Sequence, residues 1–579
     1  MDTSATPTEH SLPLRLGGFG SLAEALDYAA GGDTGFNFYS GRGELVATLT
    51  YAQLREQSLE LARRLAGLEL ERGARIALVA DTAPDFARFF FACQYAGLVP
   101  VPLSASLHLG SQRAYVGQLR HLLVNCGAAA AMAPPAYLDY LRQAAEGLPL
   151  RLLGEPAAFD DLPAGGSELR ALGPDETAFL QYTSGTTRFV RGVVVTQQAL
   201  MHNLTGILTH GIAVRKGDRA VSWLPYYHDM GFVGMVLAPI ASQVSTDYMS
   251  ATEFAKRPLQ WLALISASRG SIAFSPTFGY ELCAQRLRRE DVERFDLRSW
   301  RVAGVGAEMI RPDALETFAN QFAPAGFDRR AFVACYGMAE CSLAVSFSPL
   351  DRGLRVDRID RGRMTESRIA LPVDDTPSKA EVGRFVNCGR ALPGFEVEIR
   401  DEDGTVLPAR RCGSVFVRGL SVSPGYFADV AATKEVLSPD GWLDTGDLGY
   451  HVDDSLVITG RRKDLLIING RNIWPQDLEF VAAQHRQVNA AAAFSIPGLD
   501  GEETAAMVVQ CRVSDPAKRA TLVESLQAAI LGEIGIRCAI ELVPPHTLPR
   551  TSSGKLSRAG ARSGYLKRLA DAAVAPAER

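Results

Sequence analysis

Strand-like segments followed by helix-like segments recur along the first half of the chain, and no other feature limits the possible folds as strongly. From Thr50, TYAQLREQSLELARRLAGL repeats leucine at helical spacing, and the Thr50 hydroxyl can cap the first turn. ARIALVA then has the composition of a buried strand, and a second helix is expected to open at residues 81–84. SIAFSPTF stands in the same way before a helix spanning Tyr280 to Leu287. This alternation predicts an α/β fold in which helices cover parallel sheets.

The second half of the chain changes pattern twice. Short β-rich runs separated by Gly and Pro, such as VLPARRCGSVFVRGLSVSPGY, occupy residues 383–460 and predict a β-barrel-like or antiparallel subdomain. After them, helical TLVESLQAAILGEI, strand-like CAIELV and a basic Gly-containing loop predict a small α+β domain over 464–579. A chain of 579 residues is several times the usual size of one folding unit, which agrees with a large domain over 1–460 and a smaller one.

Bulk composition excludes several classes of protein. The chain is 47% hydrophobic and 22% charged, as in ordinary soluble globular proteins, and no apolar run approaches the roughly 20 residues of a membrane span. Its 60 Lys and Arg against 65 Asp and Glu give a net charge of −5, so we expect no nucleic-acid partner and no membrane-integral part. Nine scattered cysteines without a C-x-x-C pair, and a start (MDTSATPTEH) without a secretion-signal layout, predict a cytoplasmic protein.

A hydroxyl-rich turn lies between two strand-like runs in AFLQYTSGTTRFVRGVVVT. Hydroxyls and backbone N–H groups on a Gly turn suit the binding of phosphate oxygens, although the G-x-x-x-x-G-K-[ST] spacing of a Walker loop is absent. A surface turn rich in Ser and Thr is the alternative for this segment taken alone. The candidate phosphate-binding residues are Thr183, Ser184, Gly185, Thr186 and Thr187.

Six further motifs follow the hydroxyl-rich turn in order. Together they resemble the superfamily of acyl-CoA synthetases, peptide-synthetase adenylation domains and firefly-type luciferases, whose members make adenylates from carboxylic acids. The resemblance spans nearly all of the chain, and six motifs in order match by chance far more rarely than one. It implies ATP and Mg²⁺ as cofactors. The motifs are WLPYYHDMG from Trp223, RVAGVGAE from Arg301, CYGMAE from Cys335, GWLDTGDLG from Gly441, GRRKDLLIINGRNIWPQDLE from Gly460 and LPRTSSGKLSR from Leu548.

The resemblance implies a nucleotide site assembled from several of these motifs. The hydroxyl turn would hold the phosphates, Tyr336 would stack on adenine, and Asp447 with Arg461 beside it would bind the ribose diol. Glu340 would hold Mg²⁺ together with Thr183 and the phosphates, since this hard cation needs oxygen ligands. A core aromatic at Tyr336, an exposed helix acid at Glu340 and an ordinary DTGD turn are the alternatives. The remaining implied adenosine contacts are Gly306, Ala307, Glu308, Gly337 and Met338.

Three residues have implied roles in the reaction, in which a carboxylate attacks the α-phosphorus in line and pyrophosphate leaves. Lys555, in TSSGK, would neutralise charge where the two anions meet; otherwise it is a solvated lysine. His228, in YYHDMG, would stand beside the reacting carboxylate without acting as a base, because a fatty carboxylate is already ionised near neutral pH. Lys463, in GRRKD, falls at the implied hinge over 461–463, about which the small domain would rotate between adenylation and thioester transfer.

Several sequence segments resemble those of one branch of the superfamily in particular, the fatty acyl-AMP ligases. Members of this branch pass the acyl group to a carrier protein rather than to coenzyme A. The segments include LQYTSGTTR, VSWLPYYHDMG, DLRSWRVAGVGAE, CYGMAECSLAVS and LPRTSSGKLSR. Residues 347–382 resemble the extra insertion of that branch, and an insertion near the hinge would bias the small domain away from free coenzyme A; a surface loop without this influence is the alternative. The implied partners are a fatty or other hydrophobic carboxylic acid and a phosphopantetheinylated acyl carrier protein.

The chain departs from the branch pattern at the hydroxyl turn and in the acyl pocket. RFVRG over 188–192 stands where Arg-Thr-Pro-Ala-Gly is more usual, so Arg191 either contacts a phosphate or faces solvent. Val305 stands where Asn is common, and Phe274 where small residues are frequent. The bulk of Phe274 predicts a short tunnel and therefore a medium-chain or otherwise compact acid. The implied acyl pocket consists of Phe232, Phe274, Thr277 and Val305.

Two other functions remain open at this point. An acyl-CoA or aryl-CoA ligase would share the fold and differ in the acceptor that it uses. A catalytically silent homologue acting as a binding protein is the alternative from another class. The joint retention of Glu340, Asp447, Arg461 and Lys555 argues against a silent homologue.

Overall fold

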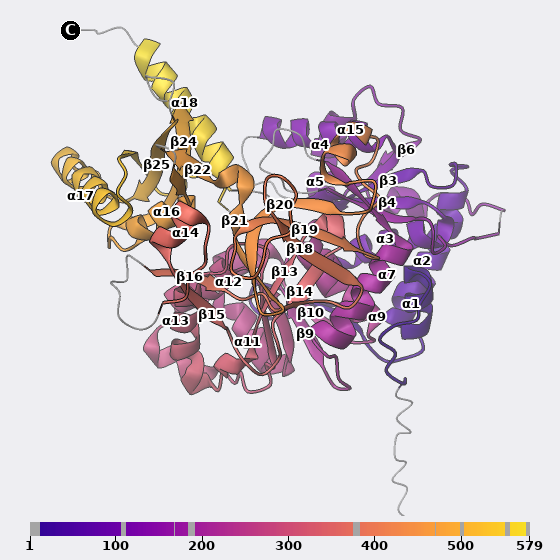
Figure 1. The fold of residues 1–579 in the computed structure, drawn as a ribbon. Coiled ribbons are helices and arrows are strands. Elements are labelled where there is room, and N and C mark those ends of the chain that lie inside the picture. Colours follow the sequence, from indigo (N-terminus) through magenta and orange to yellow (C-terminus); the bar gives the residue numbers. More distant parts are fainter. Residues whose placement is uncertain are drawn as a thin grey trace, which may run out of the picture.

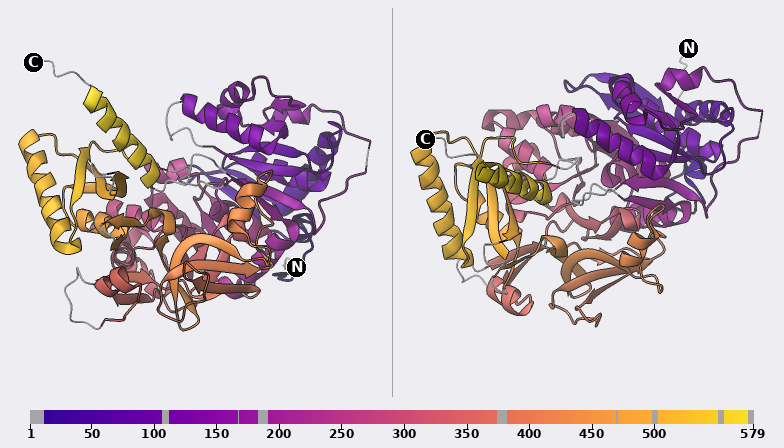
Figure 2. Two further views of the ribbon diagram at one scale, coloured as in Figure 1. Left: turned by 45° about the horizontal axis from the view of Figure 1, so that its top comes forward. Right: turned by 90° about the horizontal axis from the view of Figure 1, so that it is seen from above.

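The computed structural model describes residues 12–105, 112–166, 168–182, 191–373, 382–468, 471–497, 503–550 and 556–574. A large domain forms most of the molecule, and a small domain built from the C-terminal part of the chain stands at one end of it (Figure 1). Figure 2 shows from two further directions that the small domain, coloured orange to yellow, lies to one side of the large domain. The expected α/β fold is confirmed by the sheets and helices described below.

The largest sheet among the described residues has nine strands in the order β17-β14-β13-β12-β11-β9-β10-β1-β2. The strands from β13 to β1 run parallel, whereas β2, β14 and β17 pair antiparallel at the two edges. As predicted, β11 is a fully buried strand that leads directly into a helix, α12. The strands are β1 Gly35–Tyr39, β2 Leu45–Thr50, β9 Arg219–Ser222, β10 Ser245–Tyr248, β11 Ile272–Ser275, β12 Val302–Val305, β13 Phe332–Gly337, β14 Ala344–Phe347 and β17 Arg390–Ala391.

A second sheet is parallel throughout and has the order β4-β3-β5-β6. The helix predicted from Thr50 is confirmed, because Thr50 and Gln53 form a capping box at the start of α2. The helix predicted from residues 81–84 is also present as α3, and Gly97 ends it in the left-handed region with φ +72°. The elements are β3 Arg75–Ala80, β4 Val99–Ser104, β5 Ala128–Met132, β6 Leu152–Gly154, α2 Tyr51–Ala66, α3 Pro84–Ala96, α4 Gln112–Cys126, α5 Pro135–Ala145 and α6 Pro156–Asp160.

Helices of the large domain cover the sheets and connect their strands (Figure 1). None of the helices within the described ranges combines the length and the apolar character that a bilayer span requires. The remaining helices of this domain are α1 Leu22–Ala29, α7 Gln197–Gly206, η1 Ile207–Gly211, α8 Asp229–Phe232, η2 Val233–Leu237, α9 Ala238–Ala241, α10 Ala251–Lys256, α11 Leu259–Ser268, α12 Thr277–Arg286, η3 Arg289–Arg294, α13 Pro312–Phe322, η4 Ala323–Ala325, η5 Arg329–Ala331, η6 Ala339–Cys341 and α15 Val430–Val436.

The β-rich part of the large domain is an antiparallel sheet in the order β18-β19-β20-β21. The described strands from β18 to β21 thus pair antiparallel, which agrees with the β-rich character predicted for residues 383–460. The insertion contributes β15 and α14, and β15 pairs antiparallel with β16. The elements are β15 Val356–Asp360, α14 Arg361–Ser367, β16 Val382–Val386, β18 Phe395–Arg400, β19 Gly413–Gly419, β20 Leu443–Val452 and β21 Ser455–Arg461.

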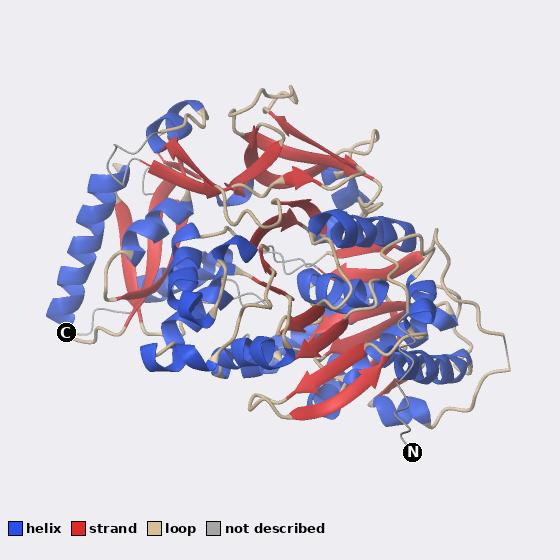
Figure 3. Cartoon of the chain, turned by 90° about the horizontal axis from the view of Figure 1, so that it is seen from below, coloured by secondary structure: helices blue, strands red, loops and turns tan. Residues whose placement is uncertain are grey.

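The small domain has a three-stranded sheet in the order β24-β25-β26, flanked by helices (Figure 3). Its apolar core is separate from that of the large domain and includes Leu478, Met507 and Leu526. The predicted helix TLVESLQAAILGEI and strand CAIELV are confirmed as parts of α17 and as β26. The elements are β22 Leu466–Ile468, β23 Arg471–Ile473, α16 Pro475–Ala483, β24 Val488–Pro497, β25 Glu503–Cys511, α17 Pro516–Ile534, β26 Cys538–Val543 and α18 Arg558–Val574.

The two domains meet where the chain passes through η8, Arg462–Asp464. An apolar cluster at this junction joins Ile359 and Met364 from the insertion, Tyr450 from β20 and Trp474 from the small domain. The insertion is therefore packed into the junction, because its apolar side chains share one core with both domains.

Candidate active site

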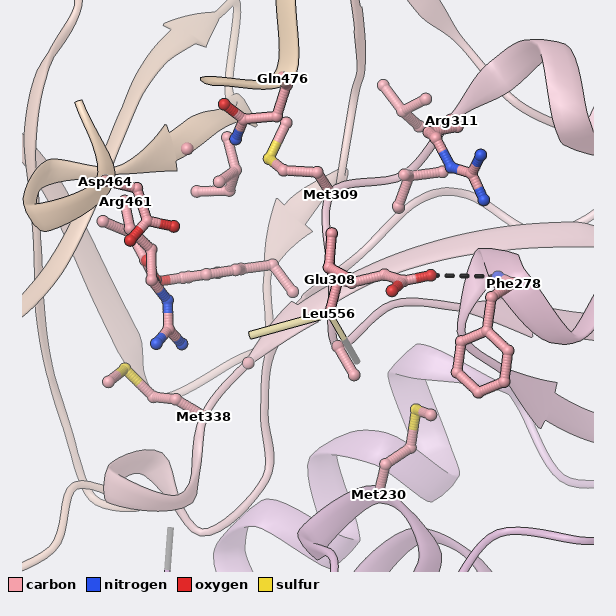
Figure 4. Close-up of a pocket in the computed structure, with 18 of the residues that line it drawn as sticks. Met230, Phe278, Glu308, Met309, Arg311, Met338, Arg461, Asp464, Gln476 and Leu556 are labelled. Carbon is pink, nitrogen blue, oxygen red and sulfur yellow. Dashed lines mark hydrogen bonds and ion pairs between the residues drawn. The ribbon is translucent and has the colours of Figure 1, made fainter. Parts of the chain in front are cut away.

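A cleft of about 2550 Å³ lies between the large and the small domain. Tyr336, Glu340 and Asp447 line it from the large domain, and Gln476 and Leu556 line it from the small domain. Figure 4 shows this mixed lining, with Gln476 and Leu556 in the same view as other residues of the large domain. Side chains from both domains therefore face one cavity.

Tyr336 and Asp447 form a buried pair at the cleft wall. Tyr336 lies in β13 and Asp447 in β20, and the Tyr336 hydroxyl donates a hydrogen bond of 2.7 Å to Asp447 Oδ2. Burial raises the pKa of Asp447, while the Arg461 guanidinium, 3.5 Å from Oδ1, opposes that rise. Burial and the neighbouring carboxylate raise the pKa of Tyr336, so the phenol stays neutral and acts as the donor. A carboxylate held this way on Oδ2 can accept hydroxyl hydrogen bonds at Oδ1.

The turn after β12 brings a second acid to the cleft. A side chain at Gly306 would lie 2.7 Å from Cys335 Sγ, so only glycine fits this close approach. Ala307 follows with φ +66°, in the left-handed region. The next residue, Glu308, faces the cleft and accepts a hydrogen bond of 3.1 Å from the backbone N–H of Phe278 (Figure 4). Ala307 and Glu308 thus line the cleft, while Gly306 packs behind them.

Glu340 lies partly buried in η6 and faces the same cleft. Tyr426 donates a hydrogen bond of 2.8 Å from its hydroxyl to Glu340 Oε1. Burial raises the pKa of Glu340; the Tyr426 hydrogen bond opposes the rise, and nearby Asp229 adds to it. An anion beside a second anion in a buried wall favours a bound cation.

Glu340 fits Mg²⁺ better than a metal held by protein side chains alone. Within the described ranges, no group of three or more His, Cys, Asp or Glu side chains could hold a metal ion. Mg²⁺ commonly takes one or two carboxylates and completes its oxygen ligands with phosphates and water. A single carboxylate at a nucleotide cleft therefore agrees with this donor set.

The predicted acyl pocket is only partly at the cleft. Phe274 lines it and meets Phe347 edge-on, with ring centroids 6.4 Å apart. Phe232 is fully buried in an aromatic cluster with Phe86 and Phe90, and it is not among the residues that line the cleft.

The other predicted acyl-pocket residues are likewise set back from the cleft surface. Thr277 and Val305 have no exposed surface and stand behind the lining. Apolar residues that do line this part of the cleft, none of them predicted, are Ile207, Ile212, Gly234, Leu343, Ala344 and Phe347.

His228 and Lys463 both line the cleft. His228 caps α8, and its Nδ1 lies 2.7 Å from Asp229 Oδ1. Lys463 lies in η8, between β21 and β22. Gly337 and Met338 line the cleft next to Tyr336.

Several predicted residues lie outside the described residues. They are Thr183, Ser184, Gly185, Thr186, Thr187, Arg188 and Lys555. Their described neighbours face the cleft: Tyr182 ends β7 (Thr177–Tyr182), Arg191 precedes β8 (Gly192–Thr196), and Leu556 follows Lys555. Arg550 and Leu556 both line the cleft and form a β-bridge with each other.

Tyr426, Asp229 and Arg361 also line the cleft, and sequence reasoning did not single them out. Tyr426 follows a Pro-Gly pair in SVSPGY, but nothing in its spacing connects it with Glu340, 86 positions away. Arg361 opens α14 in the insertion and pairs with Asp477 of the small domain at 3.3 Å. Long-range contacts of this kind carry no periodic signal in the sequence.

Comparison with protein families matches residues 36–427 to the family described as AMP-binding enzyme. A protein of Caulobacter vibrioides (strain NA1000 / CB15N), provisionally named acyl-CoA synthetase, is 44% identical over 566 residues and covers 97% of this chain and 98% of its own. JamA of Moorena producens (strain JHB), named medium-chain-fatty-acid–[acyl-carrier-protein] ligase, is 29% identical over 579 residues, which cover 96% of each chain.

A solved structure from a study of fatty acyl-adenylate ligases from E. coli and L. pneumophila superposes with a TM-score of 0.92. It is 44% identical in sequence and covers 96% of this chain and all of its own. This likeness extends over both domains and the junction between them.

Proposed function

The chain belongs to the family of AMP-binding enzymes, and from this premise we propose that it activates a fatty acid with ATP to give fatty acyl-AMP and pyrophosphate. One observation carries the proposal: Tyr336, Asp447 and Glu340 face a cleft that the small domain closes with Leu556, the neighbour of Lys555. The similarity to proteins named fatty acyl-adenylate and fatty-acid–AMP ligases supports the same reaction.

Binding of the nucleotide divides among residues of the large domain. Tyr336 offers an aromatic face to adenine, and Asp447 offers Oδ1 to the ribose while Tyr336 holds Oδ2. The exposed guanidinium of Arg461 adds a charged donor beside the same carboxylate. Thr183 to Thr187 would hold the phosphates through hydroxyl and backbone N–H groups.

Chemistry in this proposal requires little beyond positioning and charge neutralisation. A carboxylate oxygen of the acid attacks the α-phosphorus, the bond to pyrophosphate breaks, and its electrons leave with the pyrophosphate oxygen. Lys555 Nζ would neutralise the two anions that meet at this point. When bound, Mg²⁺ would supply charge neutralisation at the phosphates, and Glu340 and Thr183 would be its protein ligands. His228 stands beside the acid and takes no proton, because the acid reacts as a carboxylate.

The acid in our proposal is medium-chain or otherwise compact. Phe274 stands in the cleft wall against Gly304, where a Cβ would lie 2.1 Å from the ring, so the ring fills the space beside β12. Apolar residues such as Ile207, Ile212 and Phe347 also line the cleft and would suit an alkyl chain. The name of JamA, which specifies medium-chain fatty acids, agrees with this choice.

The acceptor in our proposal is the phosphopantetheine thiol of an acyl carrier protein. Support comes from the insertion, which packs at the junction through Ile359 and Met364 and pairs Arg361 with Asp477. Through these contacts the insertion would bias the small domain away from the arrangement that accepts free coenzyme A. The carrier-protein specificity in the name of JamA points the same way.

Coenzyme A is the second candidate acceptor. The Caulobacter relative that is 44% identical over nearly the whole chain carries the name acyl-CoA synthetase. That name and the name of JamA differ in the acceptor and agree on the activation of an acid, so the acceptor needs its own test.

Pyrophosphate release across a panel of acids tests acid, reaction and acceptor together. The panel contains butyrate, octanoate, dodecanoate, palmitate and benzoate, each alone, with coenzyme A and with a phosphopantetheinylated carrier protein. We expect release to be greatest with octanoate or dodecanoate, and thioester to form with the carrier protein. Equal thioester formation with coenzyme A would replace the carrier by the second candidate. No release with any acid would contradict the adenylation proposal itself.

A further inference from the structure

We propose that Tyr426 is a positioning residue that orients the Glu340 carboxylate toward the cation bound with the nucleotide. This inference rests on the proposed function, because it takes Glu340 to be the metal ligand. Its physical basis is the hydrogen bond of 2.8 Å from the Tyr426 hydroxyl to Glu340 Oε1 at the wall of the cleft. With Oε1 held in this way, Oε2 can be presented to the cation.

The segment that carries Tyr426 holds Glu340 at two points. Besides the phenol bond to the side chain, the backbone N–H of Ser423 donates a hydrogen bond of 2.7 Å to the carbonyl of Glu340. The same segment accepts a hydrogen bond of 3.2 Å from Ser342, two residues beyond Glu340, at the carbonyl of Ser421. Backbone and side chain of the acid are therefore both bound to residues 421–426.

Tyr426 is itself fixed to the strand that begins just after the hydroxyl turn. Its backbone N–H donates a hydrogen bond of 2.9 Å to Thr433 Oγ1, and it forms a β-bridge with Val193 in β8. The N–H of Phe427 donates a hydrogen bond of 2.8 Å to the carbonyl of Gly192. The phenol consequently reaches Glu340 from a segment that is held against β8 and α15 by hydrogen bonds from its backbone N–H groups.

Arg191 completes the arrangement on the face of the Tyr426 ring. Its guanidinium carbon lies 5.2 Å from the ring centroid, within the range of a cation–π contact, and its Nη2 lies 3.4 Å from Glu435 in α15. The nearby cation makes the phenol a stronger hydrogen-bond donor toward Glu340.

The position of the Tyr426–Glu340 hydrogen bond favours a role in metal binding over a purely structural role. Hydrogen-bond partners of metal ligands orient the ligand, and their loss typically costs about 10- to 100-fold in metal affinity or activity. Tyr426 and Glu340 both line the cleft, so their hydrogen bond lies where the cation of a bound nucleotide would act. The charges facing this pair are Asp229, Arg461, Arg191 and Glu435.

The test measures metal affinity directly and needs no turnover. Mn²⁺ is titrated into the full-length protein with a non-hydrolysable ATP analogue, and free Mn²⁺ is followed by electron paramagnetic resonance. For Tyr426→Phe we expect Mn²⁺ to bind about tenfold more weakly than to the wild type. Arg191→Met keeps the hydroxyl and removes the cation from the ring, and we expect about a two- to fivefold loss.

A matched control separates this effect from the loss of any buried phenol bond. The Tyr95 hydroxyl donates a hydrogen bond of 2.7 Å to Asp27, beside Arg55, and none of the three lines the cleft. Tyr95→Phe should therefore bind Mn²⁺ within about twofold of the wild type. Wild-type affinity in Tyr426→Phe would overturn the inference, and so would an equal loss in Tyr95→Phe.

Two further outcomes separate this inference from the proposed function. Glu340→Gln should lose the Mn²⁺ site, and unchanged binding there would overturn the inference, because Tyr426 acts through that carboxylate. If no acid supports pyrophosphate release while Tyr426→Phe still weakens Mn²⁺ binding, the proposed function fails and the role of Tyr426 stands.

Discussion

Asp447 is a buried carboxylate whose two oxygens have different partners. The Tyr336 phenol donates to Oδ2, and the exposed guanidinium of Arg461 stands 3.5 Å from Oδ1. Burial raises the pKa of Asp447, and these two partners oppose the rise. As a carboxylate in the cleft wall it would suit a pair of ribose hydroxyls, because hydrogen bonds to a charged group are stronger than those between neutral groups.

Replacing Asp447 by Asn should therefore weaken ATP binding more than it slows the reaction. The amide keeps the shape of the side chain and loses the charge that strengthens the ribose contacts. We expect the KM for ATP to rise about tenfold or more, with a smaller change in kcat, measured as acid-dependent pyrophosphate release. Glu396→Gln, which removes an exposed acid from the same sheet, is the control and should leave both constants near their wild-type values.

Replacing Lys555 should have the opposite effect on the kinetic constants, lowering kcat more than it raises the KM for ATP. This lysine is proposed to act where the carboxylate meets the α-phosphate, so its loss removes charge neutralisation from the transition state rather than from the bound nucleotide. For Lys555→Ala we expect kcat for pyrophosphate release to fall about 100-fold or more, with the KM for ATP little changed. Lys567→Ala, an exposed lysine on α18, is the control in the same domain. Full activity in Lys555→Ala would contradict the assigned role.

At the residue scale, motifs could predict side chains that line the cleft. They could not predict which neighbouring side chains are buried in the core instead. Tyr336 and Asp447 belong to separate motifs, and they meet at one hydrogen bond. Phe232 directly follows the WLPYYHDMG motif, yet its ring packs against Phe86 and Phe90. The rotation of the short helix α8 decides between core and cleft. That rotation follows from packing with residues far away in the chain.

At the scale of elements, residues of the predicted insertion contact the small domain. α14 begins at Arg361, whose guanidinium lies 3.3 Å from Asp477 in α16, and both side chains are largely buried. Burial raises the pKa of Asp477, and Arg361 opposes the rise. Removal of one member of such a pair leaves an uncompensated buried charge. The pair therefore stabilises the present placement of α16 against the insertion.

Arg361→Met should loosen this contact and change the choice of acceptor. We expect the ratio of acyl-CoA to acyl-carrier product to rise about threefold or more, because the small domain is then less biased away from the arrangement that accepts free coenzyme A. The double variant Arg361→Met with Asp477→Leu replaces the ion pair by an apolar pair and should restore the wild-type ratio. Product ratios from a competition assay with both acceptors decide the matter. If the product ratio of Arg361→Met equalled that of the wild type, the contact between the insertion and the small domain would have no part in selecting the acceptor.

Elements with a local signal could be predicted, whereas their order in the sheets could not. The capping box at Thr50 and the buried run before α12 both depend on residues close together in sequence. The nine-stranded sheet instead places β1 beside β10, more than 200 positions away. The pairing of β15 with β16 across the insertion is also non-local. Such pairings depend on global packing, which a single sequence does not display.

At the scale of the whole molecule, binding and catalysis are proposed to reside in different domains. Tyr336, Glu340 and Asp447 belong to the large domain, which has its own apolar core. Lys555 belongs by sequence to the small domain, which has a separate apolar core. Leu556, the next residue in the chain, lines the cleft. Two cores joined through one junction permit the small domain to move as a body.

A chain truncated after Arg462 should therefore bind nucleotide and fail to adenylate. It keeps Tyr336, Asp447 and Arg461, so calorimetry should show ATP bound within about tenfold of the full-length affinity. It lacks Lys555, so pyrophosphate release should fall about 100-fold or more, to the level of full-length Lys555→Ala. Circular dichroism checks that the fragment is folded, since truncation removes Trp474 from the junction cluster. A folded fragment that released pyrophosphate at the full-length rate would show that the large domain catalyses alone, and a folded fragment without ATP binding would place part of the nucleotide site in the small domain.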